Sequence, residues 1–592
     1  MTSRGTPAIV ARVTSSAAFE EVDRLVDAFV QEEPVPGVAY GVLLDGELIH
    51  TRGIGTARVG RDTSPGPDTV FRIASMTKSF TAATVLHLRD EGLLRLDDPV
   101  AEHVPELAEP RSQGRDMPPL SIRHLLTMTA GFPSDDAWGD RQQDLDLDSF
   151  ARLLRGGQSF AWMPGTQFEY SNLGYGILGR VITNVAGREY RDVVRSRLLQ
   201  PMNMTSTAFD VDGLPAEQLA TGYTRRDDAF VEEPLDGYGA LASMGGLFST
   251  VRDLARWIDG FLRAFSPRGG SDDHPLSRAS RLEMQQPQRG IDPELQWTSI
   301  DQPPTAMALG YGFGLFTRSD LQLGRLVAHS GGYPGFGSHM RWHPASGLGV
   351  IVLGNRTYFE AMKVAEKMLR LLVNARVAPV RRIAPAPPLE AARLAIERLL
   401  EGWDDELAAA TFSMNVDLDE PIERRRAEID RLRETHGRLR RSEQPSTMES
   451  PFQLAWWLEG ERGRVQVEIS LDPQPEPKVQ SLDLTSVPEP DARLREAAER
   501  LVGSNGDDVA DLPLGDDLDR VSVQRDLRLV RALFGACSLG PCIAGDGAGA
   551  TFRVSAERGD LDLILTENTE TGRILAVRWA PCPVRPPLSD VR

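Results

Sequence analysis

The sequence of 592 residues predicts an α+β protein in which a large N-terminal domain precedes two small α+β units. Three observations lead to this prediction. Strand patterns lie at both ends of residues 1–375 with helical patterns between them, a proline-rich segment follows at 376–388, and the remainder contains an internal repeat. We therefore expect one antiparallel sheet flanked by helices, a linker, and C-terminal units at 389–487 and 488–592.

The first predicted elements are a helix and a strand hairpin. Apolar residues at helical spacing predict an amphipathic helix over 18–30. Strands are predicted at 38–44 and 47–53, because they flank Asp45-Gly46, a pair that suits the positive φ angles of a two-residue turn. The next strong helical pattern covers 75–90 and stops before a glycine.

The end of the N-terminal domain returns to strands. Three strands and a helix are predicted, at 324–329, 336–342, 347–353 and 359–374. Strands from both ends of the domain then share one sheet, and a helix must pack on that sheet to bury its apolar stripe. We therefore expect the start of the 75–90 helix to lie near His329, at the end of a strand.

The region after residue 375 begins as a linker and continues as a repeat. Residues 376–388 contain four prolines, which favours an extended connection. Each repeat copy shows two helical stretches and then strands, and Glu-Arg-Gly forms a turn in both, at 461–463 and 557–559. A cone-like sheet around a helix and a small β-barrel both fit this pattern. Such units serve in binding or dimerisation, or as packing or lid domains without chemistry of their own.

Composition excludes several classes of partner. The net charge of −19 repels phosphate backbones and anionic lipids, so we expect neither nucleic acid nor membrane as a partner. The longest apolar runs are far shorter than a membrane span, and residues 1–13 lack an apolar signal segment, which predicts a cytoplasmic protein. The three cysteines lack zinc-site spacing, so neither a metal nor another cofactor is expected.

The first candidate site is Ser75-Met76-Thr77-Lys78. Lysine is rare in this chain, and unlike arginine a buried lysine can lose its proton and act as a base. Three residues apart on a helix, the Ser75 hydroxyl and the Lys78 amine lie on one face and can meet. The pair therefore predicts an activated serine nucleophile, while a helix cap followed by a surface lysine is the alternative.

The second candidate is Tyr170-Ser171-Asn172. A phenol beside an ammonium group has its ionised form favoured, so Tyr170 next to Lys78 is a candidate general base and later acid. The amide of Asn172 either holds a substrate carbonyl or tunes Lys78. Taken alone, the same residues are typical of a turn ahead of a helix.

The third candidate is His329-Ser330-Gly331-Gly332, at the end of a predicted strand. Glycines there let the backbone approach a ligand closely. The backbone N–H groups of Ser75 and Gly332 are then candidates for an oxyanion hole, which stabilises acyl-transfer transition states. His329 considered by itself fits a hydrogen-bonded structural histidine equally well.

In this order the three motifs resemble those of the serine β-lactamase and penicillin-binding-protein superfamily, on its class C branch. Segments 71–80, 120–133 and 245–255 are also similar to that group, and the resemblance covers about residues 15–375. It implies a covalent acyl-enzyme on Ser75, with Lys78 and Tyr170 moving protons. It further implies that Asn172 positions the acyl side chain and that no metal takes part.

One departure from the family pattern bears on the substrate. The third motif of most β-lactamases and DD-peptidases begins with lysine, whereas His329, largely neutral near pH 7, stands here and weakens carboxylate recognition. His329-x-Gly331 instead resembles D-aminopeptidases, which release a D-residue from a free amino end, and related esterases. We expect hydrolysis of small amides, peptides or esters. A β-lactamase or DD-carboxypeptidase is the first alternative, a non-catalytic binding or sensor protein the second, and homodimerisation is compatible with each.

Overall fold

The computed structural model describes residues 6–107, 117–265, 272–296, 305–320, 323–379, 385–444, 446–504, 509, 512–546, 548–557 and 559–582. They divide into two compact units. The first comprises the described part of Met1–Leu295 and Ala306–Val380, and the second includes the described residues from Arg381 onward. None of the described helices is long and apolar enough to cross a membrane.

The first unit is built on an eight-stranded sheet with the order β2-β1-β12-β11-β10-β9-β8-β7. Its strands are β1 (Gly37–Leu44), β2 (Glu47–Gly55), β7 (Arg289–Gln296), β8 (Thr305–Tyr311), β9 (Phe316–Asp320), β10 (Gly324–Tyr333), β11 (Phe336–His343) and β12 (Leu348–Gly354). The β1 and β12 strands pair antiparallel from Val38 opposite Gly354 to Leu44 opposite Leu348. Sequence from both ends of the unit therefore closes one sheet, as predicted.

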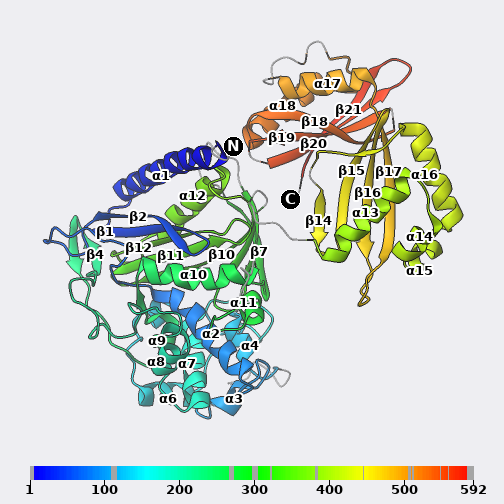
Figure 1. The fold of residues 1–592 in the computed structure, drawn as a ribbon. Helices are drawn as coiled ribbons and strands as arrows, with labels where there is room; N and C mark the ends of the chain where they lie inside the picture. Colours follow the sequence, from blue (N-terminus) through cyan, green and yellow to red (C-terminus); the bar gives the residue numbers. More distant parts are fainter. Residues whose placement is uncertain are drawn as a thin grey trace. The chain divides into compact units, whose positions relative to one another are not determined.

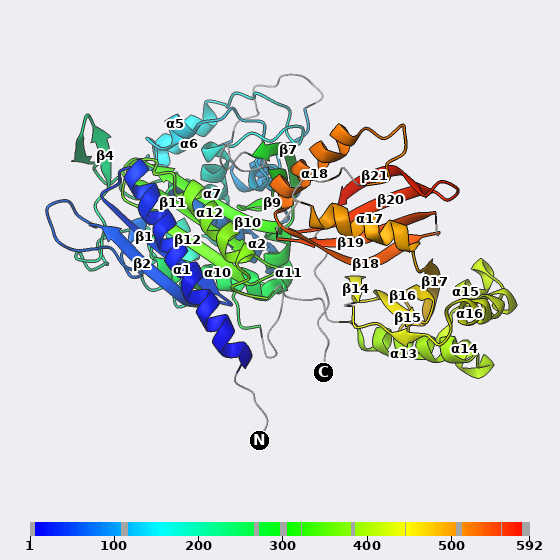
Figure 2. The same cartoon turned by 90° about the horizontal axis from the view of Figure 1, so that it is seen from above.

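Helices α1 (Thr6–Glu32) and α12 (Ala361–Asn374) cover one face of this sheet (Figures 1 and 2). Successive strand residues point to opposite faces, so Tyr40 joins the core beneath α1 and α12, whereas Ala39 joins the core on the other side. The hairpin turn follows the predicted pattern, with φ angles of 51° at Asp45 and 84° at Gly46.

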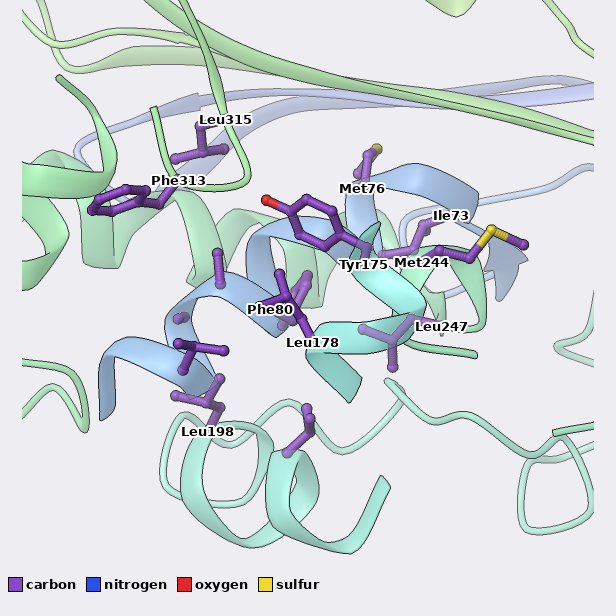
Figure 3. Close-up of a cluster of buried hydrophobic side chains, with 14 of the residues drawn as sticks. Ile73, Met76, Phe80, Tyr175, Leu178, Leu198, Met244, Leu247, Phe313 and Leu315 are labelled. Carbon is purple, nitrogen blue, oxygen red and sulfur yellow. The ribbon is translucent and has the colours of Figure 1, made fainter. Parts of the chain in front are cut away.

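The other face carries most of the helices. They are α2 (Thr77–Asp90), α3 (Val100–His103), α4 (Ile122–Leu126), α5 (Asp136–Gly139), α6 (Leu147–Arg155), α7 (Asn172–Ala186), α8 (Tyr190–Val194), η2 (Arg195–Leu199), α9 (Ala242–Gly245), α10 (Val251–Phe265) and α11 (Arg278–Met284). Short strands β3 (Phe71–Arg72) with β6 (Phe248–Ser249) and β4 (Tyr223–Arg226) with β5 (Ala229–Glu232) form two small ladders. Figure 3 shows Phe80, Leu178 and Leu247 gathered in one apolar cluster, which fixes α2 among its neighbours.

The predictions for this unit hold with two corrections. The 75–90 helix begins as a 3₁₀ turn, η1 (Ala74–Met76), before α2, and the strand predicted to end at residue 329 continues to Tyr333. Strands β7, β8 and β9 were not predicted. Regular apolar alternation marks a strand that is buried on one face. The β7 strand lies at the sheet edge and contains proline and charged residues, so its sequence lacks this alternation.

The second unit contains two open sheets, one of five strands and one of four. The first consists of β13 (Arg440–Arg441), β14 (Thr447–Ser450), β15 (Gln453–Gly460), β16 (Gly463–Leu471) and β17 (Val479–Pro488), with α13 (Pro387–Glu401), α14 (Asp405–Thr411), α15 (Met414–Asp419) and α16 (Ile422–His436). The second consists of β18 (Cys537–Gly545), β19 (Gly549–Ala556), β20 (Gly559–Asn568) and β21 (Arg573–Pro581), with α17 (Ala492–Gly503) and α18 (Arg520–Phe534). The α+β prediction is confirmed, and the open strand orders favour the cone-like alternative.

The two copies repeat each other in backbone geometry. The shared Glu-Arg-Gly turn ends at Gly463 with φ 128° and at Gly559 with φ 124°, although Arg558 lies outside the described residues. The last helices, α16 and α18, both stop at a glycine, Gly437 with φ 76° and Gly535 with φ 81°. The first copy departs from the predicted two helical stretches, because α14 and α15 are inserted. The domain boundaries themselves stay predictions.

Candidate active site

The candidate nucleophile sits in a strained turn. Short strand β3 leads to Ala74, whose φ of 48° is unusual for a residue with a side chain, and Ser75 follows in the 3₁₀ turn. Such a conformation costs on the order of 1–3 kcal/mol and persists only where surrounding structure enforces it. Here the Ile73 N–H donates to the Leu247 carbonyl at 2.9 Å, which ties the turn to the β6 segment.

Lys78 lies one helical turn farther and is fully buried. Its Nζ donates to Ser75 Oγ at 3.0 Å, to Asn172 Oδ1 at 2.7 Å and to the Met244 carbonyl at 2.8 Å. These bonds use all three hydrogens of the ammonium group. Burial lowers the pKa of Lys78 to about 8, although nearby carboxylates, Asp136 first, oppose the shift. A considerable fraction of neutral amine is therefore present near pH 8.

Tyr170 lies two residues before the start of α7. The Lys78 Nζ lies 4.9 Å from the centre of its ring, and the Ser75 side chain acts on its hydroxyl. Burial raises the pKa of Tyr170 well above its usual value, and this outweighs the opposing effect of the Ser75 side chain. The expectation that the ammonium group favours the phenolate is therefore wrong for this structure. The phenol is neutral and can relay a proton rather than start as a base.

Asn172 is fully buried, and both the oxygen and the nitrogen of its side-chain amide are hydrogen-bonded. Its Oδ1 accepts from Lys78, and its Nδ2 donates to Asp136 Oδ1 at 2.9 Å. Asp135 accepts from the Asn172 N–H at 2.7 Å and from the Leu173 N–H at 2.8 Å, which holds the first turn of α7. Of the two predicted roles, these contacts are those of a residue that tunes Lys78.

The carboxylates of Asp135, Asp136 and Asp140 near Lys78 were missed by sequence reasoning. All three come from the segment at α5, between residue 134 and residue 140. Burial raises the pKa of Asp140 to about 6, and the Tyr358 hydroxyl donates to its Oδ2 at 2.8 Å. The available signal was the adjacent pair Asp135-Asp136, directly after the family-like segment 120–133.

His329 and the two glycines of its motif lie in β10, and His329 lines the same cavity as Ser75. The His329 Nδ1 is 2.6 Å from the Ser330 carbonyl, so it carries the proton and donates, and Nε2 faces the Tyr311 hydroxyl at 3.5 Å. Burial, and then the charge of Lys78, lower the pKa of His329 to about 3. The predicted neutral state of His329 is therefore confirmed.

The two glycines of the third motif, Gly331 and Gly332, have different structural roles. A Cβ at Gly331 would lie 2.1 Å from the Ile73 carbonyl oxygen, so only glycine lets β10 pack against the nucleophile turn. A Cβ at Gly332 would meet the ring of Tyr358 at 2.9 Å. Gly331 thus serves close packing, whereas Gly332 lies at the surface of a cavity.

That cavity has a volume of about 630 Å³ and is shared by most of the predicted residues. Ser75, Tyr170, His329 and Gly332 line it, whereas Lys78, Asn172 and Gly331 do not. The remaining lining side chains include apolar Phe168, Phe316 and Met362 and polar Asp136, Asp140, Arg318, His339 and Tyr358. Among the described residues, no group of three His, Cys, Asp or Glu side chains is arranged to hold a metal.

The site thus places a serine hydroxyl against a buried lysine, between an antiparallel sheet and a helical layer, which is the arrangement expected of a serine nucleophile. The chain belongs to the Beta-lactamase family, whose model matches residues 22–375. The resemblance to the serine β-lactamase and penicillin-binding-protein superfamily is therefore confirmed.

Known proteins resemble the chain to different extents. Protein flp of Staphylococcus aureus (strain N315) is 28% identical over 358 residues, which are 60% of this chain and 66% of that protein. The D-alanyl-D-alanine-carboxypeptidase/endopeptidase AmpH of Escherichia coli (strain K12) is 27% identical over 57% of this chain and 84% of its own length. The octameric penicillin-binding protein homologue from Pyrococcus abyssi shares the fold, with a TM-score of 0.52 at 18% identity over 93% of this chain and 96% of its own.

Proposed function

We propose that this protein forms a covalent acyl-enzyme on Ser75 and hydrolyses small amides, short peptides or esters. The observation that carries the proposal is the buried Lys78 amine, 3.0 Å from Ser75 Oγ, with its pKa lowered to about 8. A lysine in this state accepts a proton from a hydroxyl far more readily than an exposed lysine of pKa near 10.4.

The reaction proceeds in two halves. Ser75 Oγ bonds to the substrate carbonyl carbon while its proton passes to Lys78, and Tyr170 relays a proton to the leaving nitrogen or oxygen as that bond breaks. Water then attacks the acyl ester, one of its protons returns through the same pair to Ser75 Oγ, and the acid is released. Because Tyr170 is neutral and lines the same cavity as Ser75, it gives up one proton as it receives another.

Carbonyl activation is assigned to the backbone. The N–H groups of Ser75 and Gly332 are the proposed oxyanion hole, which supplies a large electrostatic term in acyl transfer. The glycine-dependent approach of β10 to the Ile73 carbonyl brings the two segments together and supports this assignment. His329, neutral in this structure, takes part as a pocket wall and not as a fixed charge.

The substrate class follows from that neutral histidine. A β-lactamase or DD-carboxypeptidase is the second candidate, favoured by the name of the AmpH relative. Most enzymes of those kinds recognise a substrate carboxylate with a lysine at the position of His329, and that charge is missing here. D-aminopeptidase-like or esterase-like hydrolysis is therefore preferred. Homodimerisation stays a prediction.

Covalent labelling tests the proposal. The unsubstituted protein should react with a fluorophosphonate probe, and Ser75→Ala should abolish the label, because it removes the hydroxyl that the Lys78 amine contacts. Acylation by a fluorescent penicillin, compared with turnover of D- and L-aminoacyl amides and short esters, separates the two candidate activities. An unlabelled but folded protein would favour the non-catalytic binding alternative instead.

A further inference from the structure

One carboxylate in the cavity has unused binding capacity. Asp140 is 6% exposed and lines the same cavity as Ser75. Its Oδ2 accepts from the Tyr358 hydroxyl, and among the described residues its Oδ1 has no hydrogen-bond donor. Buried carboxylates normally have their oxygens paired, so an unpaired oxygen in a cavity is positioned for a ligand.

The Lys78 ammonium group does not donate to Asp140. The three hydrogens of the Lys78 ammonium are already donated to Ser75, Asn172 and Met244. Among the described residues no ion pair joins Asp140 or Asp136 to a lysine, arginine or histidine, although the charges of Lys78 and Arg72 act on Asp140 from a distance. The cavity wall therefore carries two carboxylates, Asp136 and Asp140, while the lining guanidinium of Arg318 is paired with Glu366.

Apolar side chains line another part of the same cavity. Phe168, Phe316 and Met362 give it an apolar wall suited to a hydrocarbon or aromatic side chain. A ligand that satisfies both walls has an apolar side chain and a cationic donor close to the carbonyl that Ser75 attacks. An amino acid derivative with a free α-amine has both groups on one carbon.

We propose that Asp140 binds the free ammonium group of an aminoacyl amide or ester, so that the enzyme selects acyl donors with an unblocked amino end. This inference rests on the proposed function for the identity of the attacked carbonyl. The Asp140 Oδ1 accepts from the ammonium, while the Tyr358 hydroxyl holds Oδ2 and fixes the carboxylate in place.

Binding to a protein that cannot turn over provides the test. Ser75→Ala protein is titrated calorimetrically at pH 7 with phenylalanine amide and with N-acetylphenylalanine amide, using both enantiomers. The free amine should bind about tenfold to hundredfold more tightly, the range of one charge-assisted hydrogen bond. Adding Asp140→Asn should erase this preference, while Asp144→Asn, which removes an exposed charge outside the cavity lining, should preserve it.

The outcomes separate the two proposals. Equal affinity for the free and acetylated amides, or a preference that survives Asp140→Asn, overturns the role of Asp140, whatever the enzyme does. If Asp140→Asn does not fold, the comparison in Ser75→Ala protein alone decides. Loss of fluorophosphonate labelling in the unsubstituted protein would overturn the proposed function, whereas the amide titration does not depend on catalysis.

Discussion

At the scale of single residues, the position of Lys78 is the basis of the proposed chemistry. Four lysines occur in the whole chain, and this one is fully buried with three hydrogen-bond acceptors around it. Arginine keeps its proton at any working pH. Substituting Lys78→Arg should therefore reduce kcat/KM by about 10²–10⁴-fold, the range of general acid–base catalysis, although the positive charge remains. Steady-state kinetics on a short ester checks this, and near-normal turnover would refute the proton role.

The pH dependence follows from the same residue. Lys78 accepts a proton only as the neutral amine, and its pKa is lowered to about 8, so acylation should accelerate with rising pH and level off above about 8. An ordinary lysine would give a rise only near pH 10. Rates of fluorophosphonate labelling measured from pH 6 to pH 10 test this expectation.

Removing a nearby negative charge should move that profile. Asp140 raises the pKa of Lys78 against the effect of burial, so Asp140→Asn should shift the rising limb to lower pH. Asp144→Asn serves as the matched control and should leave the limb in place. If the rise of the labelling rate with pH stays at the same pH in both variants, a group other than Lys78 titrates.

The residues at the site differ in how visible they are in sequence. Ser75, Lys78, Tyr170 and the glycines stand at spacings that chemistry requires, so their neighbourhood could be predicted. Asp140 could not, because it lies in an irregular segment where no periodicity assigns a direction to a side chain. The protonation of Tyr170 was missed for another reason, since the extent of burial is a property of the packed pocket.

At the scale of elements, the contact between β10 and the nucleophile turn is the tightest fit at the site. A methyl group at Gly331 would press on the Ile73 backbone oxygen at 2.1 Å, whereas one at Gly332 would meet the Tyr358 ring, a side chain that can move. Gly331→Ala should therefore destabilise the protein by about 1–3 kcal/mol and impair Ser75 labelling. Gly332→Ala should affect stability less, and thermal unfolding of both variants measures the difference.

The sheet also shows which elements a sequence can reveal. Strands β1, β10, β11 and β12 are buried runs between turn residues, and they were predicted. Strand β7 carries proline and charged residues at the edge of the sheet, and β9 carries Arg318 and a buried Asp320, so neither shows a regular apolar alternation.

At the scale of the whole molecule, the two units have separate cores. The apolar clusters of the first unit end at Ala378 among the described residues, and those of the second begin at Leu389. A chain ending at residue 385 should therefore fold and keep Ser75 labelling, because it retains every residue of both first-unit clusters. Scanning calorimetry and labelling test this, and an unlabelled or aggregated product would mean that the second unit completes the first.

Pairing of β1 with β12 has a consequence for biosynthesis. The Gly37 N–H donates to Asn355 Oδ1 across 318 residues, so the edge of β1 leaves the ribosome long before its partner exists. At about 5–20 residues per second, translation of that interval takes roughly 15–65 seconds. Throughout this time β1 lacks its β12 partner and exposes an apolar face, so the growing chain carries a strand edge that is prone to aggregate.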